Sequence, residues 1–161
     1  MKTISIVVLL FFLISCRLNT EDNKEAAEGY LPVKKVVDGD TFWIDDGSSK
    51  GVKIRLIGVD APESRKTYQK EIGFFGKEAK IFLGNMLAEK NVKLEFDVGK
   101  FDRYHRTLAY AYLEDGTFIN AELVKQGYAM VMTVPPNVKF ADLFVKLQQE
   151  ARDNERGLWK K

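Results

Sequence analysis

Residues 33–44 read Val-Lys-Lys-Val-Val-Asp-Gly-Asp-Thr-Phe-Trp-Ile, and residues 52–59 read Val-Lys-Ile-Arg-Leu-Ile-Gly-Val. Both stretches are rich in β-branched and aromatic residues, which favour strands. Asp-Gly-Asp and Asp-Asp-Gly sequences interrupt them, and such sequences are typical of turns. The pattern therefore predicts three consecutive short strands, over residues 33–37, 41–44 and 52–59.

Two more strands are expected further along the chain. Apolar residues alternate with charged ones over residues 92–97 and with smaller ones over residues 108–112, which predicts half-buried strands. Between the third and fourth strands, an apolar stripe at helical spacing predicts a helix over residues 76–88. Five short strands with a helix between the third and fourth are typical of a small, mainly β, OB-type Greek-key barrel.

Two further helices would bring the total to about three. Asn120 is expected to cap a short helix that Gly127 ends. A second apolar stripe predicts a last helix over residues 140–156. The whole chain has 161 residues, which is enough for one compact domain with a real core.

The first 15 residues are expected to be a signal peptide. Lys2 precedes an apolar run from Ile4 to Ile14, broken only by Ser5. Such a run is shorter than the ~20 apolar residues of a bilayer-spanning helix, and it suits a signal-peptide core of about 7–15 residues. A membrane anchor or a buried core helix is the alternative interpretation.

Cys16 is the one cysteine of the chain, so an intrachain disulfide is excluded. Leu-Ile-Ser-Cys at 13–16 resembles the lipobox of bacterial lipoproteins, in which the cysteine becomes the lipidated first residue. We therefore expect an exported protein, held at the bacterial envelope membrane by lipid on Cys16. The alternative is a cysteine inside a signal peptide that is cleaved elsewhere.

Residues 17–29 are polar and lack an apolar period, so they are expected to form a flexible tether. With Cys16 they complete a segment over 16–29, and the folded domain is expected over 30–161. Net charge is only +2, so any contact with nucleic acid must come from local clusters of Lys and Arg. No protein partner is implied, and a monomer is expected.

Four clusters of charged residues carry the chemical signal. They are Val-Asp-Gly-Asp-Thr at 37–41, Arg-Leu-Ile-Gly-Val-Asp-Ala-Pro-Glu at 55–63, the basic stretch 64–70, and Asp-Arg-Tyr-His-Arg at 102–106. Each alone has an ordinary interpretation, because Asp-Gly is mostly turn chemistry and single charges are mostly solvated. Together they supply the groups that phosphodiester hydrolysis requires.

Carboxylate oxygens hold divalent cations, most naturally Ca²⁺ or Mg²⁺. A further carboxylate positions or deprotonates water, and two guanidinium groups bind a phosphate and stabilise its transition-state charge. No set of cysteine and histidine residues suits zinc, and no Ser-His-Asp triad is indicated.

The chain resembles the staphylococcal nuclease (thermonuclease) family from about Tyr30 to Trp159. Six motifs carry the resemblance in the family's order: Val-Asp-Gly-Asp-Thr (37–41), Ile-Arg-Leu-Ile-Gly-Val-Asp-Ala-Pro-Glu (54–63), Gly-Lys-Glu-Ala (76–79), Asp-Arg-Tyr-His-Arg-Thr-Leu-Ala-Tyr (102–110), Asn-Ala-Glu-Leu-Val-Lys-Gln-Gly-Tyr-Ala (120–129) and Gly-Leu-Trp (157–159). The resemblance implies a five-stranded OB-type barrel with three helices. It also implies a Ca²⁺-dependent endonuclease that acts on DNA and RNA and leaves 3′-phosphates after in-line attack by water.

The resemblance also implies roles for single residues. Asp40 and Asp60 match the metal-binding carboxylates, and Ala61 stands where a backbone carbonyl binds the metal. Glu63 matches the acid assigned as general base, a role that orienting the water would equally satisfy. The phosphate-binding arginines correspond to Arg55 and Arg106.

Some positions depart from the family pattern. His105 stands where a well-known bacterial member has glycine, and we expect it to be an exposed loop or substrate-facing residue. Arg103 replaces a substrate-binding lysine and keeps its charge, while Tyr104 matches directly. Residues 130–136 lack the aromatic residues that flank the base in that enzyme. Since base stacking is worth ~1–3 kcal/mol, we expect altered substrate affinity or base preference, with hydrolysis retained.

Two other functions compete with the enzyme. One is a catalytically inactive relative that only binds nucleic acid, although the five positions from Asp40 to Arg106 are all filled. The other is a lipoprotein whose barrel binds a saccharide or a protein, a function that would not require this set of acids and arginines.

Overall fold

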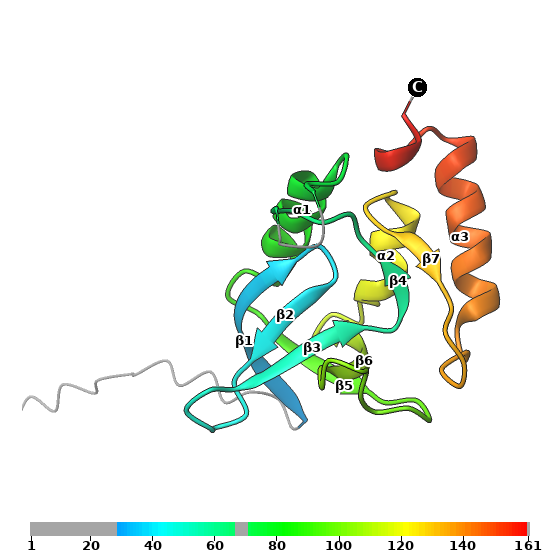
Figure 1. Ribbon diagram of the computed structural model, residues 1–161. Helices are drawn as coiled ribbons and strands as arrows, with labels where there is room; N and C mark the ends of the chain where they lie inside the picture. Colours follow the sequence, from blue (N-terminus) through cyan, green and yellow to red (C-terminus); the bar gives the residue numbers. More distant parts are fainter. Residues whose placement is uncertain (1–28, 67–70, 161) are drawn as a thin grey trace, which may run out of the picture.

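The computed structural model describes residues 29–66 and 71–160 (Figure 1). The expected signal peptide, the expected lipidation site Cys16 and the expected tether up to residue 28 lie outside the described residues. So do residues 67–70 of the basic stretch and Lys161. In the described part, no helix is long and apolar enough to cross a membrane.

Five strands close into a barrel in the order β1-β2-β3-β6-β5. Their bounds are β1 (Tyr30–Asp38), β2 (Thr41–Ile44), β3 (Val52–Leu56), β5 (Asn91–Glu95) and β6 (Thr107–Leu113). β3 and β6 pair in parallel, whereas the other neighbouring strands pair antiparallel. The predicted OB-type barrel is confirmed.

The predicted single strand over 52–59 is wrong, because the structure divides it in two. β3 ends at Leu56, and β4 (Gly58–Asp60) leaves the barrel to pair with β7 (Met130–Met132), a strand that was not predicted. Gly58 makes this change of direction with a φ of 78°, a left-handed conformation that favours glycine. A side chain there would also collide with the ring of Phe144, since a Cβ would lie 2.5 Å from its Cε2.

The three predicted helices are present as α1 (Gly76–Leu87), α2 (Ile119–Lys125) and α3 (Ala141–Asp153), and a short 3₁₀ turn (Gly157–Trp159) follows. α1 packs against β1, while α2 packs against α3 and β6. The barrel therefore has α1 on one side and the α2–α3 pair on another (Figure 1).

The predicted capping role of Asn120 is wrong. The residue at the N-cap is Phe118, and Asn120 lies inside α2 with its side chain fully buried. Its amide oxygen accepts the N–H of Ala111 at 3.0 Å, and its amide nitrogen donates to the carbonyl of Ile57 at 2.9 Å. A buried amide needs such partners, so Asn120 holds α2 against β6 and the end of β3.

Candidate active site

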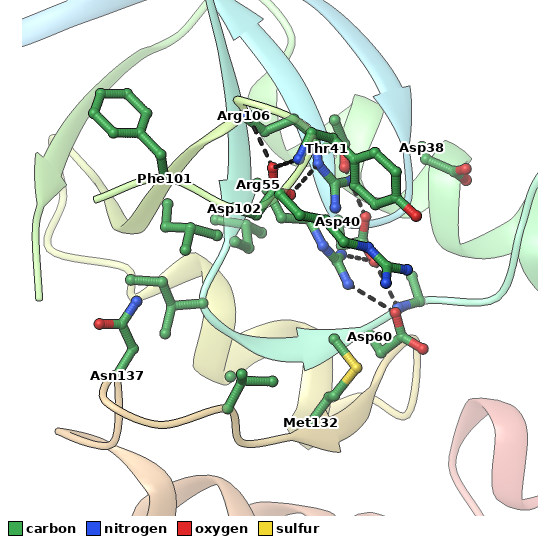
Figure 2. Close-up of a pocket in the computed structure, with 18 of the residues that line it drawn as sticks. Asp38, Asp40, Thr41, Arg55, Asp60, Phe101, Asp102, Arg106, Met132 and Asn137 are labelled. Carbon is green, nitrogen blue, oxygen red and sulfur yellow. Dashed lines mark hydrogen bonds and ion pairs between the residues drawn. The ribbon is translucent and has the colours of Figure 1, made fainter. Parts of the chain in front are cut away.

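A pocket of about 770 Å³ opens where β2, β3 and the loop before β6 meet (Figure 2). Its lining includes all five residues predicted for catalysis and metal binding: Asp40, Arg55, Asp60, Glu63 and Arg106. The lining also includes the three residues with predicted supporting roles: Ala61, Arg103 and Tyr104. Residues from distant parts of the chain are therefore brought to one cavity.

Arg55 lies at the base of this pocket and binds two acids at once. Its side chain is only 7% exposed, and it forms ion pairs with both Asp40 and Asp60. The Nη2 of Arg55 donates to Oδ1 of Asp60 at 2.7 Å (Figure 2). Burial lowers the pKa of Arg55 from its usual value, although Asp60 partly opposes this, and an arginine side chain stays protonated in proteins. A fixed positive charge thus lies between two carboxylates.

Asp40 is held by its surroundings as well as by Arg55. Its Oδ1 accepts the hydroxyl of Thr41 at 2.8 Å, and its Oδ2 accepts the backbone N–H of Ala61 at 2.8 Å. Gly39 allows this close approach, because a Cβ there would lie 2.7 Å from the Cβ of Ala61. The glycine of the Val-Asp-Gly-Asp-Thr motif is therefore required by packing between this turn and the segment after β4.

Glu63 follows β4 in a loop whose backbone is closely packed. The carbonyl of Glu63 accepts the N–H of Gly73 at 2.9 Å, and a Cβ at Gly76 would lie 2.1 Å from that carbonyl oxygen. The carboxyl group of Glu63 interacts with that of Asp38, which also lines the pocket. The first turn of α1 thus fixes the backbone that carries Glu63.

Asp38 is a pocket acid for which no role was predicted. It accepts the backbone N–H groups of Gly39 and Ser64, both at 3.0 Å. Burial raises the pKa of Asp38, and the neighbouring Glu63 carboxyl raises it further, against the lowering effect of Ser64 and of the N–H of Gly39. Asp38 therefore supports the Glu63 carboxyl, and its place two residues before Asp40 was the signal available in the sequence.

Arg106 is held by Asp102, a residue of the same loop before β6. The Nε of Arg106 donates to Oδ2 of Asp102 at 2.6 Å, and Oδ1 of Asp102 accepts the backbone N–H groups of Tyr104 and Arg106. Burial alone would raise the pKa of Asp102, but the hydrogen bonds from Arg106 and Tyr104 outweigh it and lower the pKa. Asp102 is thus an orienting residue that sequence reasoning did not assign, although the spacing of four residues to Arg106 was a visible signal.

The rim of the pocket carries Arg103 and Tyr104. Tyr104 is 60% exposed, and the guanidinium groups of Arg103 and Arg106 lie 4.8 Å and 5.5 Å from its ring centroid. His105, between Tyr104 and Arg106 in the sequence, is exposed, as expected, and has a φ of 57°. This left-handed conformation suits a glycine, which accounts for the glycine at this position in the family member considered above.

A family model described as staphylococcal nuclease homologue matches residues 53–161. The chain belongs to the staphylococcal nuclease family. It is 39% identical over 161 residues to a thermonuclease of Staphylococcus intermedius, covering 98% of this chain and 93% of that protein. It is 35% identical over 162 residues to a thermonuclease of Staphylococcus hyicus, with 96% and 94% covered.

A more distant relative has a similar name. The chain is 33% identical over 152 residues to a protein of Haemophilus influenzae called an uncharacterized endonuclease, covering 94% of this chain and 75% of that protein. Membership in the staphylococcal nuclease family, together with these names, supports a nuclease activity for this chain.

One wall of the pocket of this family member was not predicted from its sequence. Met132, Val134, Pro135, Pro136 and Asn137 line it, and Phe101 also contributes to the lining (Figure 2). The amide of Asn137 accepts the N–H of Gly99 at 2.7 Å and donates to its carbonyl at 2.8 Å, so it joins this wall to the loop that carries Phe101. Phe101 is 64% exposed, and an aromatic residue in a charged loop was the only signal for it.

The donor set suits a hard divalent cation that keeps some of its water. Among residues 29–66 and 71–160, no three His, Cys, Asp or Glu side chains converge as a complete metal site. Asp40 and Asp60 nevertheless offer carboxylate oxygens in one pocket, and the Asp60 side chain is 39% exposed. Ca²⁺ and Mg²⁺ accept carboxylate, carbonyl and water oxygens in such mixed sets.

Proposed function

We propose that this protein is a metal-dependent phosphodiesterase that hydrolyses DNA, RNA or both. The observation that carries the proposal is the contact of Arg55 with both Asp40 and Asp60, in a pocket that Glu63 and Arg106 also line. A phosphate drawn into this pocket would meet two guanidinium groups and an acid able to act on water. The family relationship supports the same chemistry.

Asp40, Asp60 and the backbone carbonyl of Ala61 would hold the cation, for which we propose Ca²⁺, with Mg²⁺ as the other candidate. When bound, the cation offsets the negative charge of the phosphate. Hydrogen bonds from Thr41 and Ala61 fix the position of the Asp40 carboxylate.

The remaining groups act on the phosphate and on water. Arg55 and Arg106 bind the phosphate oxygens through paired N–H groups and stabilise the charge that develops during in-line attack. Glu63 orients the attacking water or accepts its proton. By analogy with the family, the 5′ P–O bond breaks and a 3′-phosphate remains. Arg103 and Tyr104 at the rim bind the substrate beyond the reacting phosphate.

A cleavage assay tests this proposal. Plasmid and single-stranded DNA and RNA are incubated with the purified protein in Ca²⁺, in Mg²⁺ and in EDTA. Cleavage is expected with a divalent cation and not in EDTA. Arg106→Ala should lower kcat by about 100-fold or more, as expected for loss of a group that binds transition-state charge. Lys146→Ala, at an exposed position of α3, is the matched control and should behave like the wild type.

Intact nucleic acid under every condition would contradict the nuclease. Binding without cleavage would support the alternative of an inactive nucleic-acid-binding protein. Undiminished activity of Arg106→Ala would contradict the assignment of the site and leave the nuclease standing.

The place of action is a separate proposal. The apolar run from Ile4 to Ile14 and the following Ser15-Cys16 support export and lipid attachment at Cys16, with a monomeric domain held at the bacterial envelope. Mass spectrometry of the mature amino terminus checks this, because the expected first residue is an acylated cysteine. An unmodified terminus at another residue would contradict it.

A further inference from the structure

Three lysines surround one tryptophan on the outer face of the barrel. The Nζ atoms of Lys35, Lys50 and Lys53 lie 5.7 Å, 5.8 Å and 5.9 Å from the ring centroid of Trp43. Lys35 on β1 and Lys53 on β3 are the partners of Trp43 across the two strand pairs. Lys50 lies in the loop between β2 and β3. We call these four residues the Trp43 row.

The row faces away from the core. Phe42 and Ile44, on either side of Trp43 in β2, are buried at 0% and 2% exposure. Since successive side chains of a strand point to opposite faces, Trp43 points outward. Its ring is half-buried, and Lys35 and Lys50 are exposed.

The positive charge of the row is not neutralised nearby. In the part of the chain that the structure describes, none of the three lysines forms an ion pair, and the adjacent acid Asp45 pairs with Lys34 at 3.3 Å. Three ammonium groups around an aromatic ring form a surface suited to a polyanion with flat apolar groups. Single-stranded nucleic acid is such a ligand, because its phosphates bind cations and its bases stack on aromatic rings.

The row is continuous with the candidate active site. Lys53 lines the pocket, and it precedes Arg55 by two residues on β3, so both side chains lie on the same face. The neighbouring strand β2 has the same arrangement, because Thr41 pairs with Arg55 near the pocket and Trp43 pairs with Lys53. A path of positive charge therefore leads from the pocket across β3, β2 and β1.

We propose that the Trp43 row is a second contact for single-stranded DNA or RNA, which carries the polynucleotide away from the pocket. The lysines bind successive phosphates, and Trp43 stacks on a base. This inference rests on the proposed nuclease function. An anionic membrane surface would also attract lysines and a tryptophan, but the continuity of the row with the pocket through Lys53 favours the polynucleotide.

Tryptophan fluorescence tests the stacking directly. The chain has two tryptophans, so Trp159→Phe leaves Trp43 as the only tryptophan, whose emission is observed on excitation where tyrosine does not absorb. In EDTA, a long thymidine oligonucleotide is expected to quench Trp43 emission, whereas a thymidine dinucleotide should quench it much less. Vesicles of anionic phosphatidylglycerol are titrated in parallel. A response to vesicles and none to the long oligonucleotide would overturn the proposal.

Salt dependence tests the phosphate contacts. The triple variant Lys35→Gln, Lys50→Gln, Lys53→Gln is compared with a control triple, Lys90→Gln, Lys146→Gln, Lys160→Gln, at exposed positions outside the pocket lining. Each phosphate contact on a single strand contributes about 0.7 to the slope of log K against log salt. The row variant should therefore lose about 2 from the slope for the long oligonucleotide, and the control should lose much less.

Equal slopes in the two triple variants would overturn the proposed row. The cleavage assay keeps the two proposals distinguishable. If the wild type cleaves DNA and the row variant keeps its full salt slope, the second contact is contradicted and the nuclease proposal stands. If the wild type neither cleaves nor binds nucleic acid, both proposals are contradicted.

Discussion

Asp102 holds Arg106 by both its side chain and its backbone. Oδ2 of Asp102 accepts the Nε of Arg106 at 2.6 Å, and Oδ1 accepts the backbone N–H of Arg106 at 3.0 Å. The backbone N–H of Asp102 in turn donates to the carbonyl of Arg106 at 3.1 Å. These contacts join the two ends of the loop over residues 102–106. They also fix the Nε edge of the Arg106 guanidinium against the Asp102 carboxylate. The orientation of the proposed phosphate-binding Arg106 therefore depends on a residue outside the predicted set.

Asp102→Asn should reduce turnover through Arg106. The variant keeps the size of the side chain and removes its charge, so the charge-assisted bond to Nε weakens. We expect kcat to fall about 10-fold, which corresponds to about 1.4 kcal/mol. Asp115→Asn, in an exposed turn, is the matched control. In the Arg106→Ala background the Asn substitution should have little further effect, and fully additive losses would contradict the coupling.

The same ion pair predicts a change of stability with pH. The pKa of Asp102 is lowered from its usual 3.8, since the bonds from Arg106 and Tyr104 outweigh the effect of burial. The folded protein therefore binds this proton less tightly than the unfolded chain does. The stabilisation is present above about pH 3.8 and is lost as the pH falls through the lower folded-state pKa.

Urea unfolding of the wild type and of Asp102→Asn, repeated at several pH values, measures this contribution as the difference between their unfolding free energies. The gap in unfolding free energy should be constant from pH 7 to about pH 5 and should narrow below about pH 4. A gap that widens as the solution is acidified would have the wrong sign for this carboxylate.

Phe101 is expected to bind a base of the substrate. It lines the pocket beside the stretch 130–136, which lacks the aromatic residues found there in the family member considered above. Phe101→Ala should raise KM about 5- to 150-fold, the range that corresponds to 1–3 kcal/mol of stacking, and should leave kcat much less affected. Phe96→Ala, at a residue 50% exposed and outside the pocket lining, is the control. Equal KM values in the two variants would exclude this role.

Gly58→Ala should destabilise the protein through two separate effects. The left-handed φ of 78° costs about 1–2 kcal/mol for any residue with a Cβ. The collision with Phe144, at 2.5 Å, adds about 1–3 kcal/mol of overpacking. Gly116→Ala separates them, because Gly116 has a φ of 85° and nothing lies within 4 Å of a Cβ there. Denaturant unfolding should therefore show a larger loss for Gly58→Ala, and equal losses would rule out the packing effect.

Much of the fold and of the site follows from local sequence patterns. The β-branched and aromatic residues of 41–44, between two turn sequences, predicted β2 at its observed bounds, and the apolar stripe after residue 75 predicted α1. The charged motifs around Arg55 and Arg106 predicted groups that the structure places in one pocket. Such patterns are visible because strand and helix periods repeat over a few residues.

Other features depend on contacts between residues far apart in the chain. The chain turns at Gly58, after β3 has ended at Leu56, and Phe144 of α3 occupies the space that a side chain at this position would need. Asn120 is buried in α2 because Ala111 and Ile57 supply its hydrogen bonds. Neither relationship has a local signal, so the sequence predicted one long strand and a helix cap in their place.

The sequence by itself determined the types of the main elements and the chemical groups of the candidate site. Only the tertiary structure decided how those groups are paired: Arg55 with Asp40 and Asp60, Glu63 with Asp38, and Arg106 with Asp102. The physical reason is that a charge in a sequence can face solvent or any partner. Closure of the barrel brings β2, β3 and the loop before β6 together, and burial of Arg55 then requires its charge to be matched by nearby carboxylates.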